Sequence, residues 1–417
     1  MDKIIVNGGN PLYGEVEIGG AKNAVLPIMT ASILTPGIYT LNRVPNLRDT
    51  RTMANLLEII GAKVTYEKGT MVIDSNSCNN PTAPYDLVKT MRASFYVLGP
   101  FMGRFQHAEV SLPGGCAWGP RPVDLHLKAI EALGGTVSLE SGNIVADGQL
   151  KGADISFDIS SVGATGNALM ASAKADGIST ISIASKEPEI TSLAEFLIKM
   201  GADITGLDSD KLTVVGNPNL KGDFEFDIIP DRIEAGTFLI AVALCGGEVT
   251  LTNVNPNHLN IVLSKLSEVG VKLDIGEDTI TVKAPKKINS VNITTAPYPG
   301  FPTDLQAQWM AMMSKCDGSA VIIDEIYRDR FTHIAELSRL GANITLEDNV
   351  AVVTGVNKLK GAPVMSTDIR ASASLILSSL AAEEKSEISR VYHIDRGYEN
   401  IEEKFRNLGA DMYRISK

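Results

Sequence analysis

The sequence predicts an α/β protein of the α+β type, made of two similar domains that each contain three β-α-β-α-β-β units. The main observation is a pattern that occurs six times: an apolar stripe with helical spacing, a glycine, and an alternating segment. The repeats are spaced 73, 67, 69, 71 and 68 residues apart, counted between their pivot glycines, Gly61, Gly134, Gly201, Gly270, Gly341 and Gly409. Six units of about 70 residues therefore fill the chain.

The stripe before each glycine predicts an amphipathic helix. Positions four and one before the glycine are apolar in all six copies. The first copy has apolar residues at i, i+3, i+4 and i+7, namely Met53, Leu56, Leu57 and Ile60. Asp49 is placed to cap this helix, and Gly61 is placed to end it, since glycine accepts the left-handed conformation that closes many helices.

Strands and a second kind of helix complete each unit. The glycine is followed by two alternating strands joined by a turn, as in GANITLEDNVAVVTG (341–355). Upstream lies another strand, such as GEVTLTNV (247–254), preceded by a uniformly apolar helix such as RIEAGTFLIAVAL (232–244). Because a helix that is apolar on most sides has to be buried, we expect helices inside and sheets outside.

The six units group as three plus three. Corresponding glycines in the two halves differ by 209, 207 and 208 residues. This predicts two similar domains with a seam near residue 230, where KGDFEFDIIPDR (221–232) opens the fourth unit. A binding cleft is expected between the domains.

Composition excludes several classes of protein. The 417 residues include 38 Lys plus Arg and 49 Asp plus Glu, a net charge of −11, which argues against nucleic acid as a partner. The longest apolar stretch, 238–245, is far shorter than the roughly 20 residues needed to span a bilayer. The N-terminal segment lacks the features of a signal peptide, so we expect a cytoplasmic protein without a membrane partner.

Cysteine and histidine spacing predicts no metal site. The four cysteines are 38, 129 and 71 residues apart, and no two of the five histidines are spaced i, i+4. No phosphate-binding glycine loop or nucleophile elbow is present. We therefore expect neither a metal nor another cofactor.

The largest departure from the repeat is LPGGCAWGPRPVDLHL (112–127). Its glycines and prolines predict a mobile surface loop around Cys116. The thiol is five residues from Arg121, and exposure together with positive charge makes a cysteine reactive. A merely exposed thiol is the alternative interpretation.

Other charged residues begin or flank the predicted helices. Lys22, in IGGAKNAVLPI (18–28), could bind an anion together with the free amides of the helix it begins, although a solvated lysine is the simpler interpretation. Asp304 and Asp368 precede helices and by default would be N-caps. Four arginines lie in similar positions and would ordinarily be surface charges: Arg92, Arg330, Arg370 and Arg396.

These segments together resemble the UDP-N-acetylglucosamine enolpyruvyl transferases. The resemblance runs along the whole chain, through GGAKNAVLP (19–27), the cysteine loop, SVGAT (161–165), FPTDLQAQ (301–308) and IDRGYEN (394–400). It implies the inside-out barrel of that family, with one domain of residues 22–229 carrying the loop 112–122. Residues 1–21 plus 230–417 would form the second domain, and the active site would lie in the cleft between them.

The resemblance also implies a reaction. The enolpyruvyl group of phosphoenolpyruvate would be transferred to the 3-hydroxyl of UDP-N-acetylglucosamine by addition and elimination, with release of phosphate and without a cofactor. This is the first committed step of peptidoglycan synthesis, and phosphoenolpyruvate and the nucleotide sugar would be the partners. Guanidinium groups suit such a substrate because they bind phosphate and carboxylate through two hydrogen bonds.

The family pattern gives individual residues roles. Cys116 matches the proton donor and Asp304 the candidate base. Lys22, Arg121 and Arg396 match the phosphate site, Arg330 and Arg370 the region of the phosphoenolpyruvate carboxylate, and Asp368 a residue that orients Lys22 and Arg396. The contacts implied for the nucleotide sugar are Asn23, Arg92, Arg121, Pro122, Val123, Asp124, Leu125, Ser161, Val162, Gly163, Asp304 and Ile326.

Two alternative functions differ in a feature visible in the sequence. The shikimate-pathway enolpyruvyl transferases share the fold and reaction type but lack this cysteine loop. A catalytically idle sensor of UDP-sugars would have no need of a proton donor, whereas this chain has Cys116 together with Lys22, Asp304 and Arg396.

Overall fold

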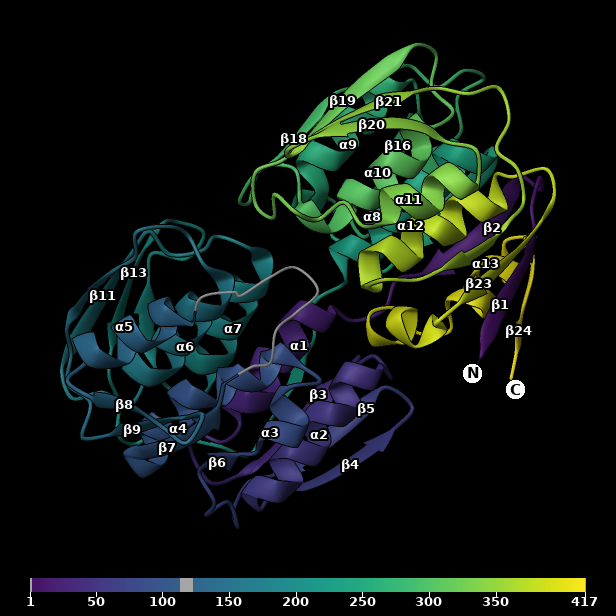
Figure 1. Ribbon diagram of the computed structural model, residues 1–417. Helices are drawn as coiled ribbons and strands as arrows, with labels where there is room; N and C mark the ends of the chain where they lie inside the picture. Colours follow the sequence, from purple (N-terminus) through teal and green to yellow (C-terminus); the bar gives the residue numbers. More distant parts are fainter. Residues whose placement is uncertain (1, 113–122, 417) are drawn as a thin grey trace. The chain divides into compact units, whose positions relative to one another are not determined.

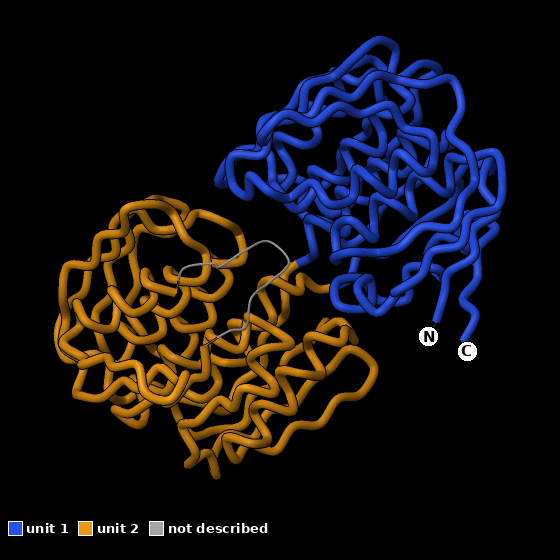
Figure 2. Tube along the Cα trace, viewed as in Figure 1, with its two compact units in different colours: residues 1–19, 230–417 blue, residues 20–229 orange. Residues whose placement is uncertain are grey.

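The chain forms two compact units (Figure 2). A computed structural model describes residues 2–112 and 123–416. Unit 1 comprises Met1–Gly19 and Pro230–Lys417, and unit 2 comprises Gly20–Ile229. The chain therefore passes from one unit to the other twice, at residues 19–20 and at residues 229–230.

The described strands form six four-stranded sheets with one shared topology. The four strands of a unit are numbered here in their order in β-α-β-α-β-β. In each sheet strand 1 pairs in parallel with strand 2, strand 2 pairs antiparallel with strand 4, and strand 4 pairs antiparallel with strand 3. In unit 2 the sheets are, in spatial order, β14 (Phe224–Asp227), β3 (Ile38–Asn42), β5 (Thr70–Asp74) and β4 (Lys63–Glu67); β6 (Thr82–Ala83), β7 (His107–Ser111), β9 (Asn143–Asp147) and β8 (Thr136–Glu140); and β10 (Asp154–Ser156), β11 (Ile178–Ser182), β13 (Lys211–Val215) and β12 (Asp203–Thr205).

The sheets of unit 1 follow the same order. They are β2 (Leu12–Glu17), β15 (Gly247–Thr252), β17 (Thr279–Lys283) and β16 (Lys272–Ile275); β18 (Ile293–Thr295), β19 (Ser319–Asp324), β21 (Val350–Thr354) and β20 (Asn343–Glu347); and β22 (Pro363–Met365), β23 (Lys385–Ser389), β1 (Lys3–Asn7) and β24 (Asp411–Ile415).

In the part of the chain that the structure describes, six inner helices form the cores of the two units, and in unit 1 the sheets surround α8, α10 and α12 (Figure 1). All eight residues of α10 are buried, and so is every residue of α8 from Ile233 to Leu244. This confirms the prediction of helices inside and sheets outside. The inner helices are α1 (Lys22–Ala31), α4 (Leu98–Phe105), α6 (Val162–Ser172), α8 (Arg232–Cys245), α10 (Gln306–Met313) and α12 (Ile369–Leu380).

Six outer helices carry the amphipathic stripes. In α2 the stripe residues Met53, Leu56, Leu57 and Ile60 are buried, as their spacing predicts. The outer helices are α2 (Arg48–Ile60), α5 (Asp124–Ala132), α7 (Pro188–Lys199), α9 (Asn260–Val269), α11 (His333–Arg339) and α13 (Ile401–Asn407). The short helices are α3 (Tyr85–Val88) and the 3-10 turns η1 (Arg92–Val97), η2 (Pro256–Leu259), η3 (Thr303–Leu305) and η4 (Val391–Arg396).

The expected opening of the fourth unit is wrong. Within KGDFEFDIIPDR, residues 224–227 form β14, which pairs in parallel with β3 and completes the sheet of the first unit. The fourth unit takes its first strand from the N-terminus instead, because β2 pairs in parallel with β15. The N-terminal β1 likewise completes the sixth sheet between β23 and β24. Local sequence predicts a strand but not its partner, since pairing is decided by hydrogen bonds to strands that are distant in the chain.

All six pivot glycines have a positive φ, between 89° and 108°. Gly61 ends α2 at φ +108°, and a Cβ placed there would lie 2.7 Å from the carbonyl oxygen of Ser77. Gly134 has φ +90°, but a Cβ there would meet no other side chain or backbone atom within 4 Å. The positive φ favours glycine at both positions, but only at Gly61 would a side chain also clash with a neighbouring atom.

We predict that Gly61→Ala destabilises the protein more than Gly134→Ala. The left-handed conformation costs alanine about 1–2 kcal/mol at either site. The contact with Ser77 adds about 1–3 kcal/mol at Gly61, which is the usual cost of overpacking. Urea unfolding followed by circular dichroism measures both. Equal losses at the two positions would contradict the steric argument.

Candidate active site

Asp304 is bound to two buried arginines in unit 1. It lies in η3, and its two carboxylate oxygens take one arginine each: Arg330 Nη1 donates to Oδ1 and Arg370 Nη2 to Oδ2, both at 2.9 Å. The default expectation that Asp304 is an N-cap is therefore wrong, because Pro302 occupies that position of η3 and the carboxylate faces the guanidinium groups.

Burial makes this ion pair strong. The side chains of Arg370 and Arg330 are 4% and 10% exposed, so neither is the surface charge that its position in the sequence suggested. Burial alone would raise the pKa of the Asp304 carboxyl, but the Arg370 and Arg330 guanidiniums hold that pKa well below its usual range. Asp304 is therefore a carboxylate at neutral pH. The three side chains together carry one net positive charge, which suits an anionic ligand.

Arg370 is positioned by a hydrogen bond at its backbone amide and by a ring contact at its guanidinium. It lies in the first turn of α12, whose N-cap is Asp368; the Asp368 Oδ1 accepts hydrogen bonds from the amides of Arg370 (2.8 Å) and Ala371 (3.1 Å). The expected capping role of Asp368 is thus confirmed. The Arg370 guanidinium lies 5.5 Å from the centre of the Tyr398 ring, a cation–π contact.

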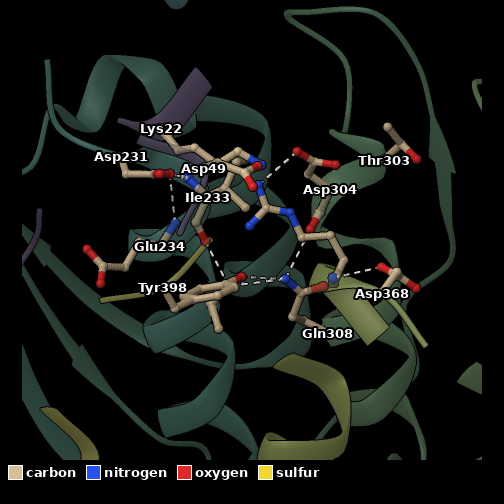
Figure 3. A network of polar contacts seen from close by, with 12 residues as sticks. Lys22, Asp49, Asp231, Ile233, Glu234, Thr303, Asp304, Gln308, Asp368 and Tyr398 are labelled. Carbon is tan, nitrogen blue, oxygen red and sulfur yellow. Dashed lines mark hydrogen bonds and ion pairs between the residues drawn. The ribbon is translucent and has the colours of Figure 1, made fainter. Parts of the chain in front are cut away.

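A buried polar layer supports Asp304 and Arg370 (Figure 3). The side-chain nitrogen of Gln308 lies 3.0 Å from the backbone oxygen of Asp304, 3.1 Å from the Thr237 hydroxyl and 3.2 Å from the Tyr398 hydroxyl, so its two hydrogens are shared among three acceptors. The Thr237 and Tyr398 hydroxyls are 2.8 Å apart. No role was expected for these three residues: Thr237 and Gln308 are neutral residues of the inner helices α8 and α10, and Tyr398 follows η4, although Gln308 and Tyr398 lie within the motifs FPTDLQAQ and IDRGYEN.

Lys22 in unit 2 is buried rather than solvated. It is the first residue of α1, and its Nζ lies 3.1 Å from Asp49 Oδ2, with the two side chains 11% and 3% exposed. Asp49 was expected to cap α2, but the N-cap is Leu47, whose amide donates to the Thr50 hydroxyl at 3.0 Å. The capping prediction is wrong because Thr50 satisfies the end of the helix, while Asp49 pairs with Lys22.

Two segments expected to contact the nucleotide sugar lie next to each other in unit 2. Ser161 is the N-cap of α6 and accepts from the amide of Ala164 at 3.3 Å; Val162 and Gly163 begin that helix. Val123 is the N-cap of α5, which Asp124 and Leu125 begin. A Cβ at Gly163 would lie 2.9 Å from His126 Cε1, so glycine allows the two helix starts to approach closely.

His126 connects these two segments through a hydrogen bond. Its sequence position alone did not indicate this role. Its Nδ1 lies 2.7 Å from the Asn167 amide nitrogen in α6, and Asn167 Oδ1 accepts from the amide of Gly99 at 2.7 Å. Burial, together with the smaller effect of the charge of Arg92, the first residue of η1, lowers the pKa of His126 to about 3. His126 is therefore neutral, and its Nδ1 accepts from Asn167.

The other expected site residues lie in several elements. Asn23 is a half-buried residue of α1, Arg396 ends η4 and is half-buried, and Ile326 follows β19. The positions expected for the reactive loop, Cys116, Arg121 and Pro122, lie outside the described residues. The proposed roles of these residues therefore stay predictions.

Within residues 2–112 and 123–416, no group of three His, Cys, Asp or Glu side chains is arranged to hold a metal ion. No helix in this part of the chain is long and apolar enough to cross a membrane. The described cysteines, Cys78, Cys245 and Cys316, are free.

The comparison with known proteins identifies the class. A family model described as EPSP synthase (3-phosphoshikimate 1-carboxyvinyltransferase) matches residues 6–405. The fold matches the enolpyruvyl transferase NikO from Streptomyces tendae with a TM-score of 0.91 at 24% identity, over 100% of this chain and 99% of that chain. It matches an EPSP synthase from Acinetobacter baumannii with a TM-score of 0.76 at 16% identity, over 100% of both chains.

Two relatives are much closer in sequence. A protein from Chlorobium chlorochromatii is 51% identical over 418 residues and 99% of both chains, and one from Desulfosudis oleivorans is 50% identical over 417 residues and 100% of both chains. Both are named UDP-N-acetylglucosamine 1-carboxyvinyltransferase. The chain belongs to the carboxyvinyltransferase family that the EPSP synthase model describes, which confirms the resemblance found in its motifs.

We predict that Asp304→Asn lowers the free energy of unfolding by about 3–5 kcal/mol, because it leaves two buried guanidiniums without their anion. A folded-state pKa below the unfolded value means that the stabilisation is present above the unfolded pKa, about 4, and is lost as the pH falls through the folded pKa. The difference between wild type and variant is thus constant from about pH 5 to 8 and shrinks only in stronger acid.

Asp348→Asn is the matched control for this measurement. Asp348 accepts from Arg328 at 3.2 Å, but the two side chains are 76% and 60% exposed, so its loss costs less than about 1 kcal/mol. Guanidinium chloride unfolding at a series of pH values measures both variants. An Asp304→Asn loss as small as that of Asp348→Asn would contradict the buried ion pair.

Proposed function

We propose that this chain transfers the carboxyvinyl group of phosphoenolpyruvate to the 3-hydroxyl of UDP-N-acetylglucosamine and releases phosphate, a step of peptidoglycan synthesis. The proposal is supported above all by 50–51% identity, over essentially the whole chain, to two proteins named for this reaction. The buried cationic site of Arg330 and Arg370 around Asp304 is consistent with a small, multiply anionic substrate.

The addition step requires two proton transfers, and the elimination that follows requires a third. The 3-hydroxyl oxygen of the sugar attacks C2 of phosphoenolpyruvate and loses its proton, while C3, the methylene carbon, gains one. Loss of a proton from C3 and departure of phosphate from C2 then restore the double bond. We assign Asp304 to the hydroxyl proton and Cys116 to the methylene proton, following the family pattern. Lys22, Arg121 and Arg396 would stabilise the departing phosphate.

Asp304 needs its substrate to become an effective base. A carboxylate whose pKa two guanidiniums hold well below its usual range accepts protons poorly. The arrival of an anion beside Arg330 and Arg370 would offset their positive charge and raise the pKa of Asp304 toward the range in which a base is useful. Phosphoenolpyruvate would thus prepare the base that acts on the second substrate.

Residues of unit 2 would bind the nucleotide sugar. Ser161, Val162 and Gly163 lie at the start of α6, where backbone amides face outward from the first turn and can donate to an anionic group. The neighbouring start of α5, Val123 to Leu125, adds backbone and apolar contacts. Asn23, Arg92, Asp304 and Ile326 would complete the set, and residues of both units would serve one reaction.

The test is phosphate release by the purified protein. With phosphoenolpyruvate present, we expect phosphate only when UDP-N-acetylglucosamine is added, together with a product heavier than the nucleotide sugar by one carboxyvinyl group in place of hydrogen. Shikimate 3-phosphate is the control acceptor, since the family model is named after that reaction. Turnover with shikimate 3-phosphate alone, or binding of the nucleotide sugar without phosphate release, would contradict the proposal.

We predict that an epoxide mimic of phosphoenolpyruvate such as fosfomycin alkylates Cys116. The thiolate opens the epoxide, so intact-mass analysis shows the whole inhibitor added once, and peptide mapping places it on 113–122. Cys116→Asp escapes alkylation and keeps some activity, because a carboxyl can donate a proton without being a soft nucleophile. Cys245→Ser is the control and leaves the adduct unchanged. An adduct on another cysteine would refute the assignment.

A further inference from the structure

We propose that Asp324 is a positioning residue of this active site, because its carboxylate orients the Thr303 hydroxyl toward Arg330 and fixes the backbone at Ile326. The inference rests on the proposed function only where it concerns catalysis. Neither Asp324 nor Thr303 was expected to have a role, although a charged residue at the end of the apolar strand SAVIID is an unusual feature.

Asp324 is a fully buried carboxylate whose oxygens are occupied by neutral donors. Its Oδ1 accepts from the Thr295 hydroxyl (2.8 Å) and from the amides of Ile326 (3.0 Å) and Tyr327 (2.8 Å). Its Oδ2 accepts from the Thr303 hydroxyl at 2.8 Å. All four donors are uncharged groups. A buried charge is costly, and four converging donors offset that cost.

The strand β19 fixes the backbone from which the Asp324 carboxylate extends. Asp324 is the last residue of β19, and its backbone exchanges two hydrogen bonds with Asn349: its amide donates to the Asn349 backbone oxygen at 3.2 Å, and the Asn349 side chain donates to its carbonyl at 3.1 Å. The Asp324 side chain therefore starts from a rigid backbone position, and the groups that bind it take their positions from β19.

The Thr303 hydroxyl links Asp324 to the ion pair of Arg330 and Asp304. A hydroxyl has one hydrogen, and Thr303 gives it to Asp324, so the lone pairs of its oxygen remain for another donor. Arg330 Nη1, which can only donate, uses them at 3.1 Å and also donates to Asp304 Oδ1 at 2.9 Å. Hydrogen bonds thus connect Asp324 through Thr303 and Arg330 to Asp304, with Arg330 donating on both sides.

The same carboxylate shapes the segment expected to contact the nucleotide sugar. By accepting from the amides two and three residues ahead, Asp324 turns the chain sharply after β19 and places Ile326 at the bend. The neighbouring Glu325 amide donates to the Thr295 hydroxyl at 3.1 Å, which is itself bound to Asp324. One carboxylate therefore sets the relative positions of Asp304, Arg330 and Ile326.

Thr303→Val and Asp324→Asn distinguish the two parts of this network, the contact with Arg330 and the turn at Ile326. Thr303→Val removes the contact with Arg330 but leaves the turn at Ile326 and Tyr327, whereas Thr303→Ser keeps the hydroxyl. Asp324→Asn keeps the shape of the side chain but leaves one acceptor oxygen where the network uses two. Asp317→Asn is the matched control, because Asp317 is 60% exposed and pairs with the surface residue Lys287 at 2.5 Å.

We expect Thr303→Val and Asp324→Asn each to lower kcat/KM at least about tenfold, the smaller end of the effect of losing a hydrogen bond to a charged group. Thr303→Ser and Asp317→Asn stay within about twofold of wild type. Because a loosened Arg330 raises the pKa of Asp304, the acid limb of the kcat profile moves to higher pH in both impaired variants, which a merely structural role would not cause.

Hydrogen exchange on the ligand-free protein provides a readout that does not depend on activity. We expect faster exchange of the Ile326 and Tyr327 amides in Asp324→Asn, and unchanged exchange there in Thr303→Val and Asp317→Asn. If the wild type turned over none of the acceptors, the proposed function would fail while this measurement still tested the position of Asp324.

Three results would overturn the inference. The first is an Asp324→Asn variant with the kinetics and pH profile of wild type. The second is a Thr303→Val variant that matches Thr303→Ser. The third is unchanged exchange at Ile326 and Tyr327 in Asp324→Asn. If Asp324→Asn fails to fold, as judged by its melting temperature, the comparison of Thr303→Val with Thr303→Ser decides the question.

Discussion

Burial of the inner helices beneath the sheets is the constraint on which the rest of this structure depends. A helix that is surrounded by protein cannot carry charge along its length, because a buried charge without a partner is too costly. In α8 and α10 the interior residues are apolar or neutral and nearly all buried. Charged groups are therefore confined to the helix ends, where the backbone leaves the core.

The candidate site residues follow from this constraint. Lys22 begins α1, Arg92 begins the turn leading into α4, and Ser161 caps α6. Asp304 lies in the turn before α10, and Asp368 caps α12 with Arg370 in its first turn. Each lies at the N-terminal end of an inner helix, where free amides and the helix dipole favour anionic ligands. The repeated design of the core thus places candidate anion-binding groups in several repeats.

The charges of Arg330 and Arg370 have two effects in unit 1, one on an anionic ligand and one on the Asp304 carboxylate. The two arginines that make the site attractive to an anion also keep the Asp304 carboxylate from taking up a proton in the ligand-free protein. Behind them, Gln308 donates to the Asp304 backbone and the Tyr398 ring contacts the Arg370 guanidinium (Figure 3). Asp324 accepts from the Thr303 hydroxyl, which in turn accepts from Arg330. The charges are few and closely placed, and the layer that orients them is largely uncharged.

The sequence by itself determined the six repeats, the positive-φ glycines and the two kinds of helix, because local periodicity and backbone preference are written in neighbouring residues. Its motifs also indicated the family and most of the charged candidates. Only the tertiary structure decided that β14, β2 and β1 complete sheets far along the chain, that Asp49 pairs with Lys22 rather than capping α2, and that Asp324 governs Thr303. Those outcomes depend on hydrogen bonds and ion pairs between residues distant in sequence, for which a local pattern contains no signal.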